Sequence, residues 1–177
     1  MKLLTLKFIL IFIYLISSSS SYAIQQLNLK NLIVHKDPKK LEKINFQNIN
    51  NETVNLSKFK NSLIVINFWA TWCAPCLEEM PTFERLYRRY RSQGLTVLAV
   101  SLDKGNSEKV KKFTDANNFT FPVLLDSEGI AEKRYPSFTI PFTYVIDKKG
   151  RIAARVDEAK NWATNETFEA LEILVKG

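Results

Sequence analysis

Residues 63–69, LIVINFW, form a largely apolar run rich in branched side chains, with Asn67 as its one polar residue. A strand of this composition must be buried on both faces, as it is in the centre of a sheet. A turn is expected over residues 71–75, and an amphipathic helix from about Cys76 to Ser92. The side chains that keep one face of this helix apolar are Leu77, Met80, Phe83, Leu86, Tyr87 and Tyr90. A buried strand, a tight turn and a helix therefore follow one another directly, and this unit constrains the whole fold.

The remainder of the chain continues the alternation of strands and helices. Residues 44–57 predict a small hairpin around Asn50-Asn51, and residues 147–150 predict the turn of a second one. Further strands are expected over 95–102, 121–125, 142–146 and 151–156, and further helices over about 107–117, 129–134 and from Thr164 or Asn165 onward. Because strands and helices alternate early and a hairpin comes late, we expect one α/β domain over residues 44–177, with a mixed central sheet and helices on both faces.

The first 23 residues have the pattern of a signal peptide. Lys2 and Lys7 precede an apolar run at residues 8–16, and Ser21-Tyr22-Ala23 offers small residues where signal peptidase cleaves. Nine apolar residues are too few to cross a bilayer, which takes about twenty. We therefore expect an exported protein that is soluble after cleavage, in the periplasm or another extracytoplasmic compartment; the alternative is an anchor formed by residues 8–16.

Residues 24–43 predict a tether or an ordered N-terminal extension, and they hold His35, the only histidine of the chain. The net charge is +7, and removal of the signal segment would lower it to +5. A basic chain raises the question of nucleic-acid binding, but here lysines and arginines are scattered among acidic neighbours. The densest basic run, residues 85–91, is typical of a solvated helix face; its alternative is a docking patch for an acidic partner.

Cys73 and Cys76 are the only cysteines, and they stand two residues apart at the start of the predicted helix. Thiol-disulfide exchange needs a thiolate that attacks a sulfur and a second thiol that resolves the mixed disulfide. Unpaired N–H groups in the first turn of a helix stabilise negative charge and lower the pKa of a thiol there. We therefore assign Cys73 as the exposed nucleophile and Cys76 as the resolving thiol tucked beneath it.

Other uses of the pair are weaker. As a structural staple it would close almost no chain. A zinc site would need two further ligands, and the chain has no third cysteine and one histidine, which lies in the predicted tether. A peroxidase would need a peroxidatic cysteine in its own pocket, outside this motif. Copper(I) suits two soft thiolates, so a copper(I)-binding chaperone module stays open as an alternative.

The segment VINFWATWCAPCLEEMP, residues 65–81, resembles the active-site segment of the TlpA/ResA branch of thioredoxin-like proteins, which includes the thioredoxins of cytochrome c maturation. The resemblance runs from about Phe46 to the C-terminus and includes TIPFTYVIDKKGRI at residues 139–152. It implies a thioredoxin-like fold with an N-terminal hairpin before the active site and an extra strand-helix insertion after Leu95.

The resemblance also implies roles for single residues. Pro141, after Ile140, matches the family's cis-proline, whose loop lies against the disulfide and pairs with the substrate backbone. Glu79 matches an acidic residue that manages protons near the cysteines; otherwise it would be an exposed helix carboxylate. Asn67 stands where ordinary thioredoxins keep a buried aspartate. The candidate substrate-binding residues are Trp72, Ala74, Pro75, Ile140 and Pro141, whereas Trp69 could belong to the core.

The function that the resemblance implies is reduction of specific exported protein disulfides, for example in apocytochrome c or a copper-handling protein. Electrons would come from a membrane thiol transporter, and the redox-active disulfide would serve in place of any other cofactor or metal. The alternative within the same chemistry is a disulfide-forming oxidase. An oxidase needs a strongly stabilised Cys73 thiolate, and the Ala74-Pro75 dipeptide offers no histidine to supply it.

Overall fold

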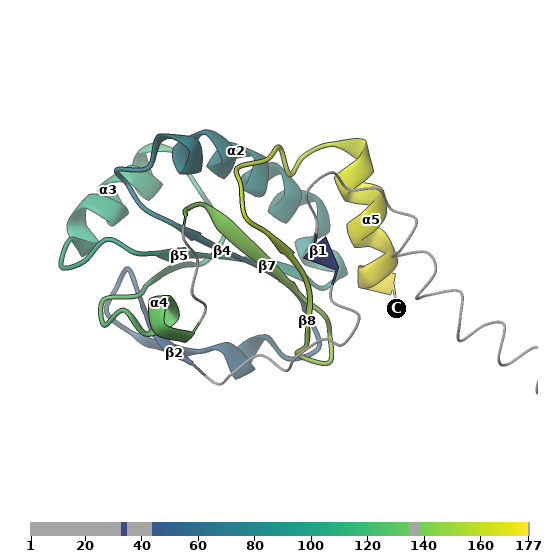
Figure 1. Ribbon diagram of the computed structural model, residues 1–177, viewed down its shortest axis with the longest axis horizontal. Helices are drawn as coiled ribbons and strands as arrows, with labels where there is room; N and C mark the ends of the chain where they lie inside the picture. Colours follow the sequence, from purple (N-terminus) through teal and green to yellow (C-terminus); the bar gives the residue numbers. More distant parts are fainter. Residues whose placement is uncertain (1–32, 35–43, 135–138, 177) are drawn as a thin grey trace, which may run out of the picture.

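The computed structural model describes residues 33–34, 44–134 and 139–176, which form one mixed sheet of eight strands (Figure 1). The strand order is β1-β8-β7-β4-β5-β6-β2-β3. The strands are β1 (Ile33–Val34), β2 (Asn45–Asn48), β3 (Thr53–Asn55), β4 (Leu63–Trp69), β5 (Leu95–Ser101), β6 (Val123–Leu125), β7 (Phe142–Ile146) and β8 (Ile152–Val156). The described helices are α2 (Ala74–Tyr90), α3 (Ser107–Ala116), α4 (Ile130–Arg134) and α5 (Asn165–Lys176), with short 3-10 helices η1 (Leu56–Phe59) and η2 (Arg91–Gln93).

Strand β4 is buried along its whole length and has a partner on each edge. It runs parallel to β5, with Trp69 opposite Ser101, and antiparallel to β7, with Asn67 opposite Thr143. The apolar run at residues 63–69 predicted such a strand with these bounds. The carboxyl ends of β4 and β5 therefore meet at one edge of the sheet, and the turn that carries the cysteines begins there.

Helix α2 begins at Ala74, two residues before the predicted start. The predicted turn included Pro75, but a proline is well tolerated in the first turn of a helix, where its missing N–H has no helical partner to lose. The buried members of the predicted apolar face are Met80, Phe83, Leu86 and Tyr90.

The arginines of the basic run at residues 85–91 are exposed on α2 and η2, whereas Leu86 and Tyr90 of the same run are buried. The Arg89 guanidinium lies 4.7 Å from the centroid of the Phe168 ring, and that of Arg91 lies 5.9 Å from the centroid of the Tyr87 ring. Both arginines are exposed. Charged heads that rest on aromatic rings while facing water favour the interpretation as a solvated helix face.

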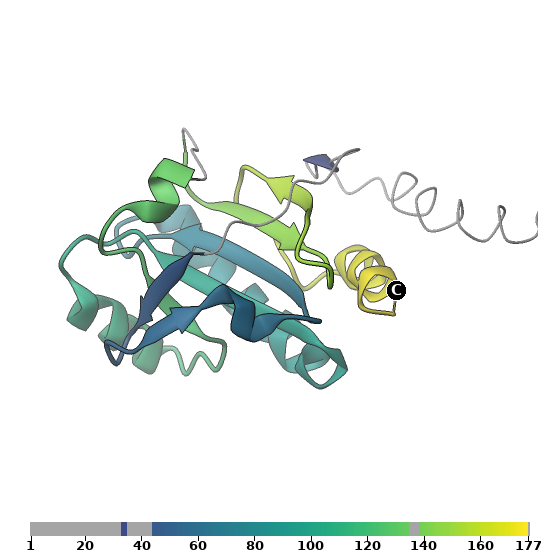
Figure 2. The ribbon, with the colours of Figure 1, turned by 90° about the horizontal axis from the view of Figure 1, so that it is seen from below.

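The two faces of the sheet are covered differently. Helices α2, α3 and α5 pack on one face, and Phe83, Val110 and Leu171 join the apolar cluster there. The opposite face is covered by the short helix α4, by η1 and by the hairpin of β2 and β3, which Figures 1 and 2 show on the side away from α2. Helices therefore lie on both faces, as predicted, but the three long ones share one face.

The first hairpin turns at the predicted place. Asn51 has a φ of +62°, a region that asparagine tolerates better than most residues, and the Asn48 side chain accepts hydrogen bonds from the N–H groups of Asn50 and Glu52. Strand β6 begins at Val123, two residues later than predicted. Pro122 explains the difference, since proline has no N–H to give to a ladder.

The predicted signal segment, residues 1–23, and its apolar run lie outside the described residues, as does His35. The boundaries at residues 23 and 43 therefore stay predictions. Within the predicted extension, Ile33 and Val34 form the edge strand β1, in which Val34 pairs with Ala154 of β8. In the described part of the chain, every helix is too short or too polar to cross a membrane.

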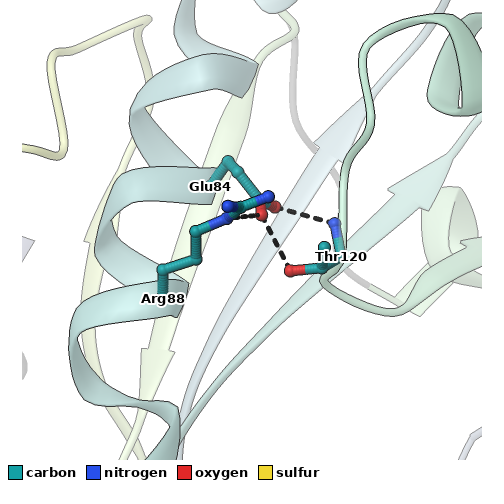
Figure 3. Close-up of polar contacts among 3 residues, drawn as sticks. All are labelled: Glu84, Arg88 and Thr120. Atoms are coloured by element: carbon teal, nitrogen blue, oxygen red, sulfur yellow. Dashed lines mark hydrogen bonds and ion pairs between the residues drawn. The ribbon is translucent and has the colours of Figure 1, made fainter.

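Glu84 joins α2 to the segment that enters β6 (Figure 3). Its carboxylate accepts hydrogen bonds from the Thr120 N–H at 2.8 Å and the Thr120 hydroxyl at 2.7 Å, and it pairs with the Arg88 guanidinium one turn along the helix. Burial by itself raises the pKa of the Glu84 carboxyl, but these donors outweigh burial and hold that pKa below its ordinary value. The contact fixes the approach to β6 across 36 positions of the sequence.

We expect Glu84→Ala to lower the free energy of unfolding by about 1–2 kcal/mol, because both Thr120 donors lose their acceptor. Arg88→Ala should cost about 0.5 kcal/mol or less, since that side chain is 57% exposed and pairs along one helix. Urea denaturation at pH 7 measures both. Equal losses would mean that the ion pair, not the bonds to Thr120, holds the segment.

Candidate active site

Cys73 and Cys76 form a disulfide at the N-terminus of α2, with their Cα atoms 5.3 Å apart. Cys73 is the N-cap residue, and its sulfur accepts a hydrogen bond from the Cys76 N–H at 3.3 Å. Backbone N–H groups at a helix start favour negative charge on an atom placed in this way. Once the disulfide is reduced, the sulfur of Cys73 is therefore positioned to be held as a thiolate.

The two sulfurs differ in access, but less than predicted. Cys76 is fully buried, whereas Cys73 keeps 6% of its surface exposed. The order agrees with the prediction of an outer and an inner cysteine, yet only a small part of Cys73 faces outward. Trp72, the residue before it, is 67% exposed, and Ala74 and Pro75 are exposed as well. A partner that reaches Cys73 must therefore touch these neighbours.

The loop before β7 lies directly against the disulfide. The peptide bond between Ile140 and Pro141 is cis, as the family resemblance implied. The sulfur of Cys73 lies 3.7 Å from the Ile140 carbonyl oxygen, so a reduced Cys73 thiol could donate a hydrogen bond there. Pro141 is buried and Ile140 is half-buried. Four of the five candidate substrate-binding residues thus have some exposed surface, and the fifth supports the loop.

Asp103 ties the turn that carries Trp72 and Cys73 to the end of β5. Its carboxylate accepts hydrogen bonds from the Thr71 N–H at 2.8 Å, the Thr71 hydroxyl at 2.6 Å and the Ser101 hydroxyl at 2.8 Å. These contacts fix the backbone two residues before Cys73. Asp103 was not identified from the sequence, although polar residues directly after a buried strand, at the edge that carries the cysteines, were a usable signal.

Glu79 is buried one turn beyond Cys76, with 2% of its surface exposed, so it is not the exposed helix carboxylate of the alternative interpretation. Its carboxylate accepts hydrogen bonds from Asn67 Nδ2 at 2.8 Å, the Lys160 backbone N–H at 3.2 Å and Trp162 Nε1 at 3.2 Å. Removal from water raises the pKa of Glu79 to about 7, although the three donors pull that pKa down. A carboxyl of this kind can take up or release a proton near neutral pH.

Asn67 connects this carboxylate to the sheet. Its amide nitrogen donates both to Glu79 and, at 3.0 Å, to the Thr143 hydroxyl on β7. Asn67 is fully buried, and among the described residues its carbonyl oxygen has no hydrogen-bond partner. Thr143 was not identified from the sequence, because it became a neighbour of Asn67 only through the pairing of β4 with β7.

Trp69, which the sequence left open between the core and the site, and Pro81, the last residue of the segment that carries the resemblance, have structural positions. Trp69 is fully buried, packs against Phe113 with ring centroids 5.4 Å apart, and belongs to the core. Pro81 lies inside α2. Trp162 and Lys160 were missed entirely. Nothing in their local sequence distinguishes them, and they meet Glu79 only because the connection from β8 to α5 folds back onto α2.

The model of the AhpC/TSA family matches residues 38–155, about two thirds of the chain. The thiol-disulfide oxidoreductase ResA of Oceanobacillus iheyensis is 39% identical over 113 residues, which make up 64% of this chain and 58% of that protein. The thioredoxin-like protein YneN of Bacillus subtilis is 41% identical over 106 residues, or 59% of this chain and 61% of that protein. The match therefore spans less than two thirds of each of these relatives.

Solved structures show the same fold at low identity. A secreted thiol-disulfide isomerase from Corynebacterium glutamicum has a TM-score of 0.72 at 23% identity, covering 84% of this chain and 92% of that one. A thiol:disulfide interchange protein of the thioredoxin family from Chlorobium tepidum has a TM-score of 0.69 at 19% identity, covering 80% and 99%. The predicted thioredoxin-like α/β fold is confirmed.

The raised pKa of Glu79 predicts how stability depends on pH. Unfolding returns that pKa from about 7 to 4.5, so between these values the folded protein holds a proton that the unfolded chain releases. The free energy of unfolding should therefore fall as pH rises across this window, by about 3 kcal/mol, and stay lower above it.

The measurement is urea denaturation of the oxidised protein at pH 5 and pH 8, beside the Glu79→Gln variant. Other groups titrate in both proteins, so the difference between the two pH dependences isolates Glu79. We expect the variant to lose this decrease in stability. Identical pH dependences would contradict a raised pKa at this carboxyl.

Proposed function

The chain belongs to the AhpC/TSA family, and from this premise we propose that it is an exported thiol-disulfide oxidoreductase that reduces specific protein disulfides. The observation that carries the proposal is the Cys73–Cys76 disulfide at the N-terminus of α2, beside a cis-proline loop and a buried carboxyl with a raised pKa. The names of the ResA relatives agree with this chemistry.

The reaction moves two electrons and leaves the protein oxidised. The Cys73 thiolate of the reduced protein attacks one sulfur of a substrate disulfide, and the other substrate sulfur leaves as a thiolate. The Cys76 thiolate then attacks Cys73, which releases the second substrate sulfur and closes the Cys73–Cys76 disulfide. A dithiol protein must then reduce this disulfide again, and a membrane thiol transporter would be that donor.

Glu79 is the proposed proton acceptor for the second step. Cys76 is fully buried, so its thiol cannot give a proton directly to bulk water. Glu79 lies three residues further along the same helix, and side chains at that spacing are neighbours. A carboxyl whose pKa is about 7 can accept the proton as Cys76 becomes a thiolate.

Substrate docking would use the rim around Cys73. Trp72 offers a large exposed apolar surface, and the backbone at Ile140 and Pro141 lies against the reacting sulfur. An extended segment of an unfolded protein could lie along this backbone while its cysteine meets Cys73. The proposed substrates are exported proteins with such a segment, for example apocytochrome c or a copper-handling protein.

Reduction is favoured over disulfide formation by the residues between the cysteines. Ala74 and Pro75 carry no charge and no side-chain donor that could stabilise the Cys73 thiolate further. We therefore expect a reduction potential more negative than about −150 mV, whereas strong oxidants lie near −120 mV. Equilibration with glutathione buffers measures this potential. A value at or above about −150 mV would favour the disulfide-forming oxidase.

A trapping experiment tests the proposed mechanism directly. Cys76→Ser removes the resolving thiol, so Cys73 should hold each substrate as a mixed disulfide that mass spectrometry identifies. The matched control is Cys73→Ser, in which the one remaining thiol is that of Cys76, which is buried. Equal capture by both variants, or capture of no extracytoplasmic protein by Cys76→Ser in the native cell, would count against a specific reductase.

A further inference from the structure

The connection between β8 and α5, residues 157–164, folds back against α2 and reaches Glu79 (Figure 1). Trp162 holds this connection in place by three contacts. Its indole stacks on Phe83 with ring centroids 5.0 Å apart, its backbone N–H donates to the Thr82 hydroxyl at 3.0 Å, and its indole N–H donates to Glu79 at 3.2 Å. Because Trp162 is almost fully buried, its indole has little freedom to turn away from the carboxylate.

Lys160 acts on the same carboxylate from the same connection. Its backbone N–H donates to the Glu79 oxygen that Trp162 also contacts. Its ammonium group lies 5.4 Å from the centroid of the Trp162 ring, within the range of a cation–π contact. A cation over the face of an indole draws electron density from the ring, which makes the indole N–H a stronger donor toward Glu79.

We propose that Trp162 and Lys160 are positioning residues that set the proton affinity of Glu79. The inference rests on the proposed function, in which Glu79 accepts the proton of Cys76. A hydrogen bond from a neutral N–H stabilises the carboxylate more than the carboxylic acid, so these donors oppose the effect of burial. Their combined action would keep Glu79 able to exchange a proton near neutral pH instead of remaining protonated.

Packing alone does not explain the hydrogen bond from the Trp162 indole to Glu79. An apolar side chain could fill the space beside Phe83, yet the residue there directs an N–H at a buried carboxylate. Asn67 supplies the remaining donor from the sheet, and it is neutral. The titratable and charged residues closest to Glu79 in its own helix are Cys76 and Glu78, and those in or next to the connection are Asp157, Glu158, Lys160 and Glu166 at the start of α5.

The test is Trp162→Phe, which keeps an aromatic ring against Phe83 but removes the N–H. We expect the pKa of Glu79 to rise by about one unit, because one hydrogen bond to its charged form is lost. Carbon-13 NMR of the labelled glutamate carboxyls, titrated in the oxidised protein, reads this pKa directly, and Glu79→Gln identifies its signal.

A second test variant keeps the proposal falsifiable if Trp162→Phe folds poorly, and a further variant serves as the control. Lys160→Met retains the backbone N–H but removes the ammonium group, and it should raise the same pKa by a smaller amount. Trp69→Phe is the matched control, because Trp69 is equally buried and, among the described residues, its indole N–H has no hydrogen-bond partner. It should leave the pKa of Glu79 unchanged. An unchanged pKa in both Trp162→Phe and Lys160→Met would overturn the proposal.

The kinetic readout separates this inference from the proposed function. Reduced protein attacks dithionitrobenzoate through Cys73 and releases one thionitrobenzoate; the attack of Cys76 on the mixed disulfide then releases a second. The pH inflection of the second release should move upward in Trp162→Phe, and Trp162→Phe should cause no such movement in a Glu79→Gln background. If the NMR pKa moves while the inflection of the second release does not, the positioning role stands and the proton step assigned to Glu79 fails.

Discussion

The structure depends on a strand that is buried on both faces and paired on both edges. Every residue of β4 is inaccessible to solvent or nearly so, and each of its edges is satisfied by a neighbour. A segment buried in this way has almost no freedom to shift its register, since a shift by one residue would exchange the two apolar faces. The turn after Trp69 therefore starts from a fixed point, and Cys73 is held where that turn meets the first N–H groups of α2.

The same strand brings a polar group into the core at a single position. Asn67 interrupts the apolar run LIVINFW, and an unpaired amide at such a depth would cost free energy. Its amide nitrogen is instead shared between Glu79 on the helix and Thr143 on β7. The contact orients the carboxylate and lowers its pKa, whereas burial, the larger effect, raises that pKa to about 7. One buried amide thus links the sheet, the active-site helix and the proton-active group.

The sequence predicted the parts of this arrangement that are local. The apolar run predicted β4, and the helical spacing of apolar residues predicted the buried face of α2. The spacing of Cys73 and Cys76 predicted the redox pair. The parts that it did not predict depend on contacts between distant segments. Trp162 and Glu79 are 83 positions apart, and Asp103 is 32 positions from Thr71. No periodicity relates such pairs. The burial of Glu79 could not be predicted from the helix either, because Glu79 directly follows Glu78, a carboxylate that is exposed.

The near-complete burial of the disulfide bears on the kind of substrate that we propose for the site. Cys73 keeps only 6% of its surface exposed, and its sulfur lies 3.7 Å from the Ile140 carbonyl oxygen. Under the proposed function, a narrow, extended segment would suit this opening, because the backbone around Ile140 could pair with a strand-like peptide. Trp72 would then add apolar contact outside the reacting centre. Since the Thr71–Asp103 contacts hold the turn in one conformation, docking need not order it first, and less binding free energy is lost to loop ordering. In the proposed mechanism, selection of substrates would rest on how well a chain segment fits between Trp72 and the cis-proline loop, and Glu79 with its donors would govern how readily the bound substrate is released.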